Sequence, residues 1–297
     1  MLPLESVPNV SEGRDAAAIA AIGGAFLAAG ARVLDVHADA DHHRSVFTLV
    51  APDDATLVEA LVAGIAETRA RVDLREHDGV HPRVGAADVV PLVPLRAGDL
   101  PRAERAAREL ARRLGGELRL PVFLYGTVGE GRRPAFFRRG GPAELQRRVD
   151  AGELVPAAGP ARLDPGAGAV LVGARSPLVA FNVDLATGDV EVARAVAAAV
   201  RESGGGLPGV QALGLLLPRS GRVQVSMNVI DVEAAPLHEV VARVVEEAAA
   251  RGVRTAGAEL VGLLPAGVVA RAAAHAVLLP LLDGGRVLEA AALEALG

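Results

Sequence analysis

ARVLDVHADADHHRSVFTLVA, residues 31–51, contains two candidate strands separated by a polar turn. Apolar and polar residues alternate before the turn, and a mostly apolar run follows it, as expected for strands with buried faces. Helices are predicted on both sides of this pair. The first predicted helix, residues 14–30, is rich in alanine and has helical apolar spacing. The second is predicted within residues 53–72, with Asp53 or Asp54 as its N-cap. The order helix, strand, strand, helix predicts an α+β unit.

The rest of the chain repeats this kind of order. An apolar, proline-bounded stretch at 84–95 is followed by an arginine-rich helix predicted at 99–115 and a buried strand predicted at 120–128. From 129 to 168 glycine, proline and arginine interrupt the pattern, and only 141–150 is predicted to be helical, so we place a boundary zone there. Beyond it we expect strands at 176–185, 209–218, 222–232 and 259–265, and helices at 189–203, 237–252 and 266–279. No sequence repeat accompanies this order, which predicts two similar α+β halves and not a solenoid.

Composition excludes several classes of protein. The 297 residues include no cysteine and no lysine, so all 31 basic residues are arginine. Disulfides, thiolate metal ligands, pyridoxal Schiff bases and Walker-type phosphate loops are therefore ruled out. A net charge of −5 and an aromatic content of 2% give no general attraction to nucleic acid or anionic membranes. The lack of cysteine and of a signal-peptide pattern favours a cytoplasmic enzyme.

The polar turn between the first two strands allows more than one interpretation. A metal-dependent phosphoesterase would use five ligands: His37, Asp39, Asp41, His42 and His43. Against this, the aspartate-rich strand and the later glycine-histidine motif of such enzymes are missing. Alternatively, the two adjacent histidines belong to a solvated turn in which Asp39 and Asp41 supply hydrogen bonds.

A second group of histidines lies in HDGVHPRVGAAD, residues 77–88. Histidine carries protons near neutral pH, so His81 is a candidate acid/base residue, and a hydrogen-bonded loop histidine is the equally compatible alternative. Gly79 and Gly85 would allow the backbone to approach a ligand closely. Arg44 opens an apolar strand, so it needs a carboxylate or a ligand as its partner.

Several segments together resemble the formiminotransferase family. VPNVSEGRD (7–15) is similar to the opening signature of that family, and LDVHADADHHRSVFTLV (34–50) and HDGVHPRVGAADVVPLVPL (77–95) are similar to the next two blocks. Further segments follow in family order: PVFLYG, FFRRGG, GAGAVLVGAR, AFNVDL, VQALGLLLP, VQVSMNVID and ELVGLLP. This collinear set covers nearly the whole chain and is more specific than any one motif.

The resemblance implies two subdomains, residues 1–174 and 175–297. Each would be a mixed β-sheet with helices on its outer face, and the two sheets would face each other across a substrate groove or tunnel. The implied reaction transfers the formimino group from N-formimino-L-glutamate to tetrahydrofolate, giving 5-formiminotetrahydrofolate and glutamate in histidine degradation. The family also implies a homodimer that needs no metal. We expect no cyclodeaminase segment after residue 297, and we therefore expect another protein to carry out any later deamination.

The resemblance also implies roles for individual residues. His81 would be the general acid/base that takes a proton from the attacking ring nitrogen and returns it to the departing amine. Both substrates carry carboxylates, which favours arginine partners in this order: Arg44 and Arg83, then Arg138, Arg139 and Arg175. For Arg138 and Arg139 a surface ion pair is the better interpretation. The expected substrate-binding set is His37, Asp39, Arg44, Arg83 and Arg175.

The folate-contacting loop of the family corresponds to residues 159–168, at the predicted break between the halves. Its members are Gly159, Pro160, Ala161, Arg162, Leu163, Asp164, Pro165, Gly166, Ala167 and Gly168. Family members often have histidine or an aromatic residue near Asp164 and Gly166, so this loop departs from the family pattern there. In the opening signature, Asn9 and Glu12 would cap the first helix or face the groove, and Ser11 is expected to be a cap.

Two further functions remain open at this point. One is a related enzyme that acts on another one-carbon folate, such as 5-formyltetrahydrofolate. The other is a folate-binding module without catalytic activity.

Overall fold

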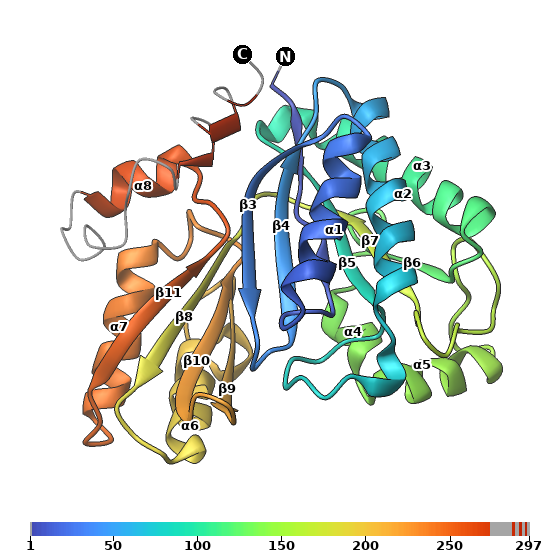
Figure 1. Ribbon diagram of the computed structural model, residues 1–297. Coiled ribbons are helices and arrows are strands. Elements are labelled where there is room, and N and C mark those ends of the chain that lie inside the picture. The colour runs from blue at the N-terminus through green and yellow to red at the C-terminus, as the bar shows by residue number, and fades with distance from the viewer. Residues whose placement is uncertain (1, 274–286, 289–290, 293–294, 296–297) are drawn as a thin grey trace. The chain divides into compact units, whose positions relative to one another are not determined.

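The computed structural model describes residues 2–273 and residues 287, 288, 291, 292 and 295. Two compact units are present: the chain up to Ser176 forms the first, and the second begins at Pro177 (Figure 1). The architecture is α+β, as predicted. Part of the predicted helix at 266–279 lies outside the described residues. No helix in the described part of the chain is long and apolar enough to cross a membrane.

The first unit is built on a seven-stranded mixed sheet. Its strands are β1 (Leu4–Ser6), β2 (Asn9–Val10), β3 (Arg32–Asp39), β4 (Arg44–Val50), β5 (Ala87–Pro94), β6 (Val122–Gly126) and β7 (Val170–Ala174). Its helices are α1 (Ala16–Ala28), α2 (Asp54–Arg71), α3 (Leu100–Glu117), α4 (Pro134–Arg138) and α5 (Gly141–Asp150), with 3-10 turns at Leu74–Glu76 and Ala97–Asp99. The strand order is β1-β4-β2-β5-β7-β6, and β3 forms an antiparallel hairpin with β4. Strands β5, β7 and β6 run parallel.

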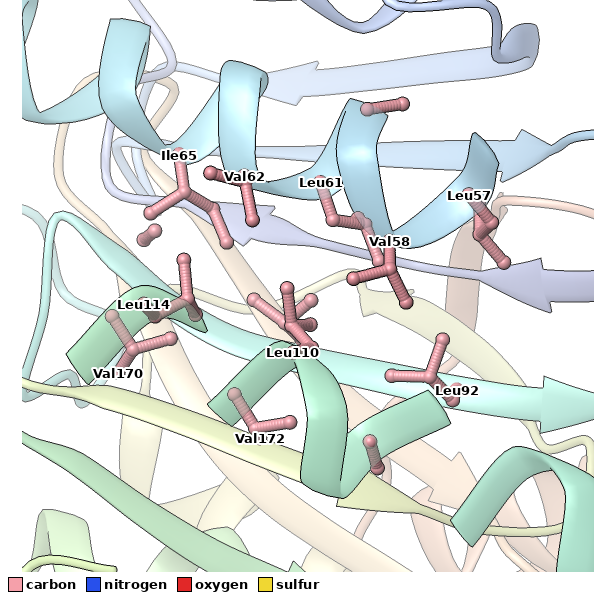
Figure 2. Packing of buried hydrophobic residues seen from close by; sticks show 14 of the residues in the cluster. Leu57, Val58, Leu61, Val62, Ile65, Leu92, Leu110, Leu114, Val170 and Val172 are labelled. Atoms are coloured by element: carbon pink, nitrogen blue, oxygen red, sulfur yellow. The ribbon is translucent and has the colours of Figure 1, made fainter. Parts of the chain in front are cut away.

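The helices of this unit cover both faces of the sheet, whereas the resemblance implied one outer face. Successive residues of a strand point to opposite sides, and on β7 Val170 and Val172 join one core cluster while Leu171 joins another. Figure 2 shows the first cluster, in which Leu61 of α2 and Leu110 of α3 pack over the strands. The second cluster includes residues of α4 and α5.

Local signals account for most helix boundaries. Asp53 accepts a hydrogen bond from the Thr56 backbone N–H and is the N-cap of α2, which confirms one of the two predicted caps. The helix α1 is capped by Asp15, whose carboxylate accepts from two backbone N–H groups. Ser11 is therefore not the cap, and that prediction was wrong: its hydroxyl donates to the Gly85 carbonyl at 2.8 Å, because the chain at Ser11 still runs beside the β5 segment.

The predicted boundary zone at 129–168 lies entirely within the first unit. This segment carries α5, predicted at 141–150, and the five-residue helix α4, which is too short to show helical periodicity. The strand β7 follows and pairs with both β5 and β6 in the first sheet, so the preceding loop belongs to that sheet as well.

The second unit has a four-stranded sheet in the order β11-β8-β10-β9. Its elements are β8 (Val179–Leu185), α6 (Val190–Val200), a 3-10 turn (Glu202–Gly204), β9 (Val210–Leu217), β10 (Arg222–Val229), α7 (Leu237–Ala249), β11 (Thr255–Val261) and α8 (Ala266–Ala273). All pairings in this sheet are antiparallel, whereas the resemblance implied a mixed sheet. A short turn joins β9 to β10, which forces these two strands to run in opposite directions.

Candidate active site

The polar turn of the sequence connects β3 to β4 and is fixed by its own side chains. The Asp39 carboxylate accepts a hydrogen bond from the His42 backbone N–H at 2.7 Å, which confirms the predicted turn bond, but the turn is not solvated as predicted, because Asp41 and His42 are buried. His43 has a φ of 50° and its Nδ1 accepts from the Gly13 backbone N–H at 3.1 Å. Within the described part of the chain, no three His, Asp or Glu side chains are grouped so that they could hold a metal ion.

Two stacked histidines, His43 of the turn and His77, form the contact between the turn and the loop that contains His81. The rings of His43 and His77 lie 4.2 Å apart between centroids, and His77 Nε2 donates to the His43 carbonyl at 2.8 Å. Burial lowers the pKa of His77 to about 4 and also lowers that of His43, so both rings are neutral near pH 7. A Cβ on Gly79 would lie 2.3 Å from the His42 carbonyl oxygen. A glycine is therefore required at position 79 so that the His81 loop can approach the backbone of the turn at His42.

The side chain of Arg83 forms hydrogen bonds with the backbone of the same loop. Its guanidinium donates to the carbonyls of His77 at 2.9 Å, Gly79 at 2.8 Å and His81 at 2.9 Å. These bonds give Arg83 a clear structural role, and its contact with a substrate carboxylate stays a prediction.

Arg44 and His81 are brought together from β4 and the 77–83 loop. Arg44 Nη1 contacts both ring nitrogens of His81 and lies 3.0 Å from Nε2. His81 Nδ1 lies 2.8 Å from the Pro82 carbonyl oxygen, which can only accept. A ring proton on Nδ1 would be donated to this carbonyl and would leave the Nε2 lone pair toward Arg44, whose Nη1, also a donor, lies 2.5 Å from Nδ1. On its other side, Arg44 donates from Nε to the Asn9 side-chain oxygen at 2.9 Å.

The electrostatics of this pair favour neutral imidazole. Burial and the adjacent Arg44 and Arg138 charges lower the pKa of His81 well below its usual value near 6.5. Burial and the charge of Arg138 lower the pKa of Arg44 to about 9, against the opposing effect of Asp88. At neutral pH the ring of His81 can therefore act as a base while Arg44 remains largely a cation.

The carboxylate of Asp88 joins the two arginines. Asp88 is 1% exposed, and its Oδ1 accepts from the Val84 backbone N–H at 2.8 Å. Its Oδ2 accepts from Arg138 Nη2 and lies 3.8 Å from Arg44 Nη1. The surface interpretation of Arg138 was wrong, because its side chain is only 14% exposed. The neighbouring Arg139 is exposed.

Sequence reasoning missed Asp88 although a signal was present. It is the only charged residue in the apolar run VGAADVVPLVPL, at the start of β5, and buried carboxylates need charged or hydrogen-bonding partners. The partner Arg138 lies 50 positions further along the chain. Only the fold brings the two together.

The remaining predicted site residues are more dispersed. His37 lies on β3 opposite Val46 of β4. Arg175 follows β7 and donates to the Ser176 carbonyl at 2.9 Å. The charges of Arg175 and Arg138 oppose the rise that burial causes in the pKa of Tyr125.

The segment 159–168 is ordered by Asp164 and tied to the strand that follows His81. Asp164 Oδ1 accepts from the backbone N–H groups of Gly166 at 2.9 Å and Ala167 at 3.0 Å. The Ala167 carbonyl in turn accepts from the Ala86 N–H at 2.8 Å. The departure from the family pattern at Asp164 thus provides an internal turn bond.

The other end of this segment borders a surface hollow. Gly159 and Pro160 line it together with the arginines Arg108, Arg112 and Arg119, and its volume is about 450 Å³. A hollow of this size is in the range of small-molecule sites, and arginine is suited to carboxylates. The residues present are therefore compatible with an anionic ligand beside the loop.

Two family models match the chain. The N-terminal subdomain of the formiminotransferase domain matches residues 3–175, and the formiminotransferase domain model matches residues 180–278. A glutamate formimidoyltransferase of Streptococcus pyogenes serotype M1 is 36% identical and covers 89% of each chain. One from Thermoplasma acidophilum is also 36% identical and covers 96% of each chain. A formimidoyltransferase-cyclodeaminase of Gallus gallus is 37% identical over 88% of this chain and 50% of the relative.

Proposed function

Because the chain belongs to the formiminotransferase family, we propose that it transfers the formimino group of N-formimino-L-glutamate to tetrahydrofolate. The products would be 5-formiminotetrahydrofolate and glutamate, in histidine degradation. The observation that carries the proposal within the molecule is the contact of Arg44 with the part-buried imidazole of His81, whose pKa is lowered by burial and by the nearby cations. Tetrahydrofolate, the co-substrate, supplies the ring nitrogen that attacks the formimino carbon.

His81 moves one proton in two steps. Nε2 accepts the proton that the attacking nitrogen loses as its bond to carbon forms, and the imidazolium then donates it to the glutamate nitrogen as that carbon–nitrogen bond breaks. Neutral His81 is ready for the first step. The same cationic surroundings that lower its pKa make the imidazolium a strong acid, which favours the second step.

Arg44 has to give way for the first step. In the structure its Nη1 lies 3.0 Å from Nε2, the atom that accepts the proton in the proposed reaction. A substrate carboxylate would compete for the guanidinium and release the lone pair, which keeps the predicted carboxylate contact of Arg44 within the proposal. His37, Asp39, Arg83 and Arg175 complete the proposed substrate-binding set.

The segment 159–168 is the proposed folate contact. It is supported by the backbone bond that ties the segment to Ala86, five residues after His81, and by the arginine-lined hollow at Gly159 and Pro160. A cytoplasmic homodimer without a bound metal remains part of the prediction.

The test is an assay of 5-formiminotetrahydrofolate formation by the purified chain from both substrates, with and without a chelator. We expect turnover that survives chelation. Turnover with 5-formyltetrahydrofolate alone would indicate the related folate enzyme, and folate binding without turnover would indicate the binding module. Near-stoichiometric binding of manganese by the purified chain would favour the phosphoesterase alternative.

A further inference from the structure

We propose that Asp88 is a positioning residue that holds Arg44 against the imidazole of His81. The inference rests on the proposed role of His81 as acid/base. The Asp88 carboxylate faces the Val84 N–H, Arg138 and Arg44, so it would act on His81 through Arg44.

The surroundings of Asp88 leave its carboxylate a single orientation. The residue is almost completely buried, and the Val84 backbone N–H binds Oδ1. Oδ2 therefore points toward the two arginines, one of which, Arg138, donates to it directly. A buried carboxylate held in this way is costly to move, because either oxygen would lose its partner.

Arg44 is held from two sides. The Asn9 oxygen accepts from Nε and Nη2, and the Asp88 carboxylate lies 3.8 Å from Nη1. Nη1 is also the atom that contacts His81. Asn9 alone would leave this end of the guanidinium without an anionic partner, so the carboxylate of Asp88 keeps it next to the ring.

One carboxylate between two arginines leaves an excess of positive charge near the imidazole. The groups whose charges act on His81 are Arg44 of β4, Arg138 of α4 and His42 of the turn, all of which lower its pKa. Asp88 of β5 partly offsets the two arginines. Its loss has two opposite consequences for His81. The missing negative charge by itself lowers the pKa further, whereas release of Arg44 from the ring raises it.

These opposite signs separate positioning from a direct field effect. In Asp88→Asn, which keeps an oxygen for the Val84 N–H, we expect NMR titration of the labelled imidazole to show an upward shift in the pKa of His81. The shift should have the same direction as in Arg44→Gln, and the double variant should shift no further than Arg44→Gln alone. An unchanged or lowered pKa in Asp88→Asn, or fully additive shifts, would overturn the proposal.

Steady-state kinetics provide the second measurement. We expect kcat of Asp88→Asn to fall roughly tenfold to a hundredfold with a smaller change in KM, and the acid limb of the pH profile to move upward. The matched control is Asp54→Asn, which removes another carboxylate bonded to an arginine, Arg102, at the start of α2. It should leave both the titration and the pH profile unchanged.

If Asp88→Asn does not fold, Asp88→Asn combined with Arg138→Gln removes the pair without a net change in charge. Loss of Arg138 alone raises the pKa of His81, so the reference is Arg138→Gln. The double variant should shift further upward than Arg138→Gln, and a shift that is no larger would count against the proposal. A wild-type protein that does not transfer the formimino group would contradict the proposed function, and the NMR titration would still decide the contact between Asp88 and Arg44.

Discussion

Arg44 and Arg112 each lie close to a carboxylate, but in very different surroundings. The side chain of Arg44 is 14% exposed and lies 3.8 Å from a carboxylate that is itself buried. Arg112 on α3 is 70% exposed and pairs with Glu109 one helical turn away. Water screens the second pair but hardly the first, so only the buried arginine changes the proton affinity of a neighbouring histidine. In a chain whose cations are all arginine, burial decides which of them can influence chemistry.

The largest effect is expected at the group on which the buried charges act. His81→Ala should lower the rate of formimino transfer by about 10²- to 10⁴-fold, because the reaction loses its proton carrier. The measurement is product formation at saturating substrates, with circular dichroism to verify the fold. Near wild-type turnover in a folded His81→Ala protein would assign the proton transfer to another group.

Truncation of the buried carboxylate should have the largest effect on stability. Asp88→Ala leaves Arg44 and Arg138 without their shared anion and the Val84 N–H without an acceptor, so we expect a loss of about 3–5 kcal/mol in the free energy of unfolding. Denaturant unfolding monitored by circular dichroism would measure it. A loss below about 1 kcal/mol would mean that the surroundings rearrange to hydrate the two arginines.

Replacement of the buried arginine, Arg44→Gln, should change how activity depends on pH. Arg44 lowers the pKa of His81, so its removal should raise that pKa toward 6.5 and move the acid limb of kcat/KM to higher pH. Wild-type activity, which needs the neutral ring, should persist to a lower pH than that of the variant. The full pH profile of both proteins provides the measurement, and a limb that stays in place would show that Arg44 does not set the proton affinity of His81.

The smallest effect is expected for the exposed counterpart. Arg112→Gln removes the ion pair with Glu109 and should change the free energy of unfolding by about 0.5 kcal/mol or less. Arg112 also lines the hollow beside the proposed folate-contacting segment, so the comparison with Arg44→Gln uses the position of the acid limb, which should match the wild type, and not the size of kcat/KM. A shifted acid limb in Arg112→Gln would mean that exposed arginines also act on His81 over a distance, and the distinction between buried and exposed cations would then fail.

Much of the fold could be predicted because its signals are local. The α2 cap at Asp53 depends on one short side chain three residues from its partner, and the alternation in β3 and β4 depends on neighbours in the chain. Composition placed the boundary zone too early in the chain, whereas the family resemblance placed the boundary at residues 174 and 175. The loops of 129–168 look like a linker by composition, but the parallel strand β7 that follows pairs within the first sheet.

In the candidate site, too, local signals could be predicted and contacts between distant segments could not. Arg44 and His81 were identified from motif and residue type, and the structure places them in contact. Neither the position of Arg138 nor the importance of Asp88 followed from the sequence, since one was interpreted as a surface residue and the other was overlooked. The role of Ser11 was misread for a related reason, because its partner is 74 positions away.

The amino-acid sequence by itself determined the family, the predicted acid/base histidine and the restriction to arginine as the only basic side chain. These depend on residue identity and order alone. The tertiary structure decided which arginines are buried, that Asp88 lies between two of them, and that His81 is held neutral beside Arg44. Burial and charge proximity arise between segments far apart in the chain, so they exist only once β2, β4, β5, α4 and the 77–83 loop have come together.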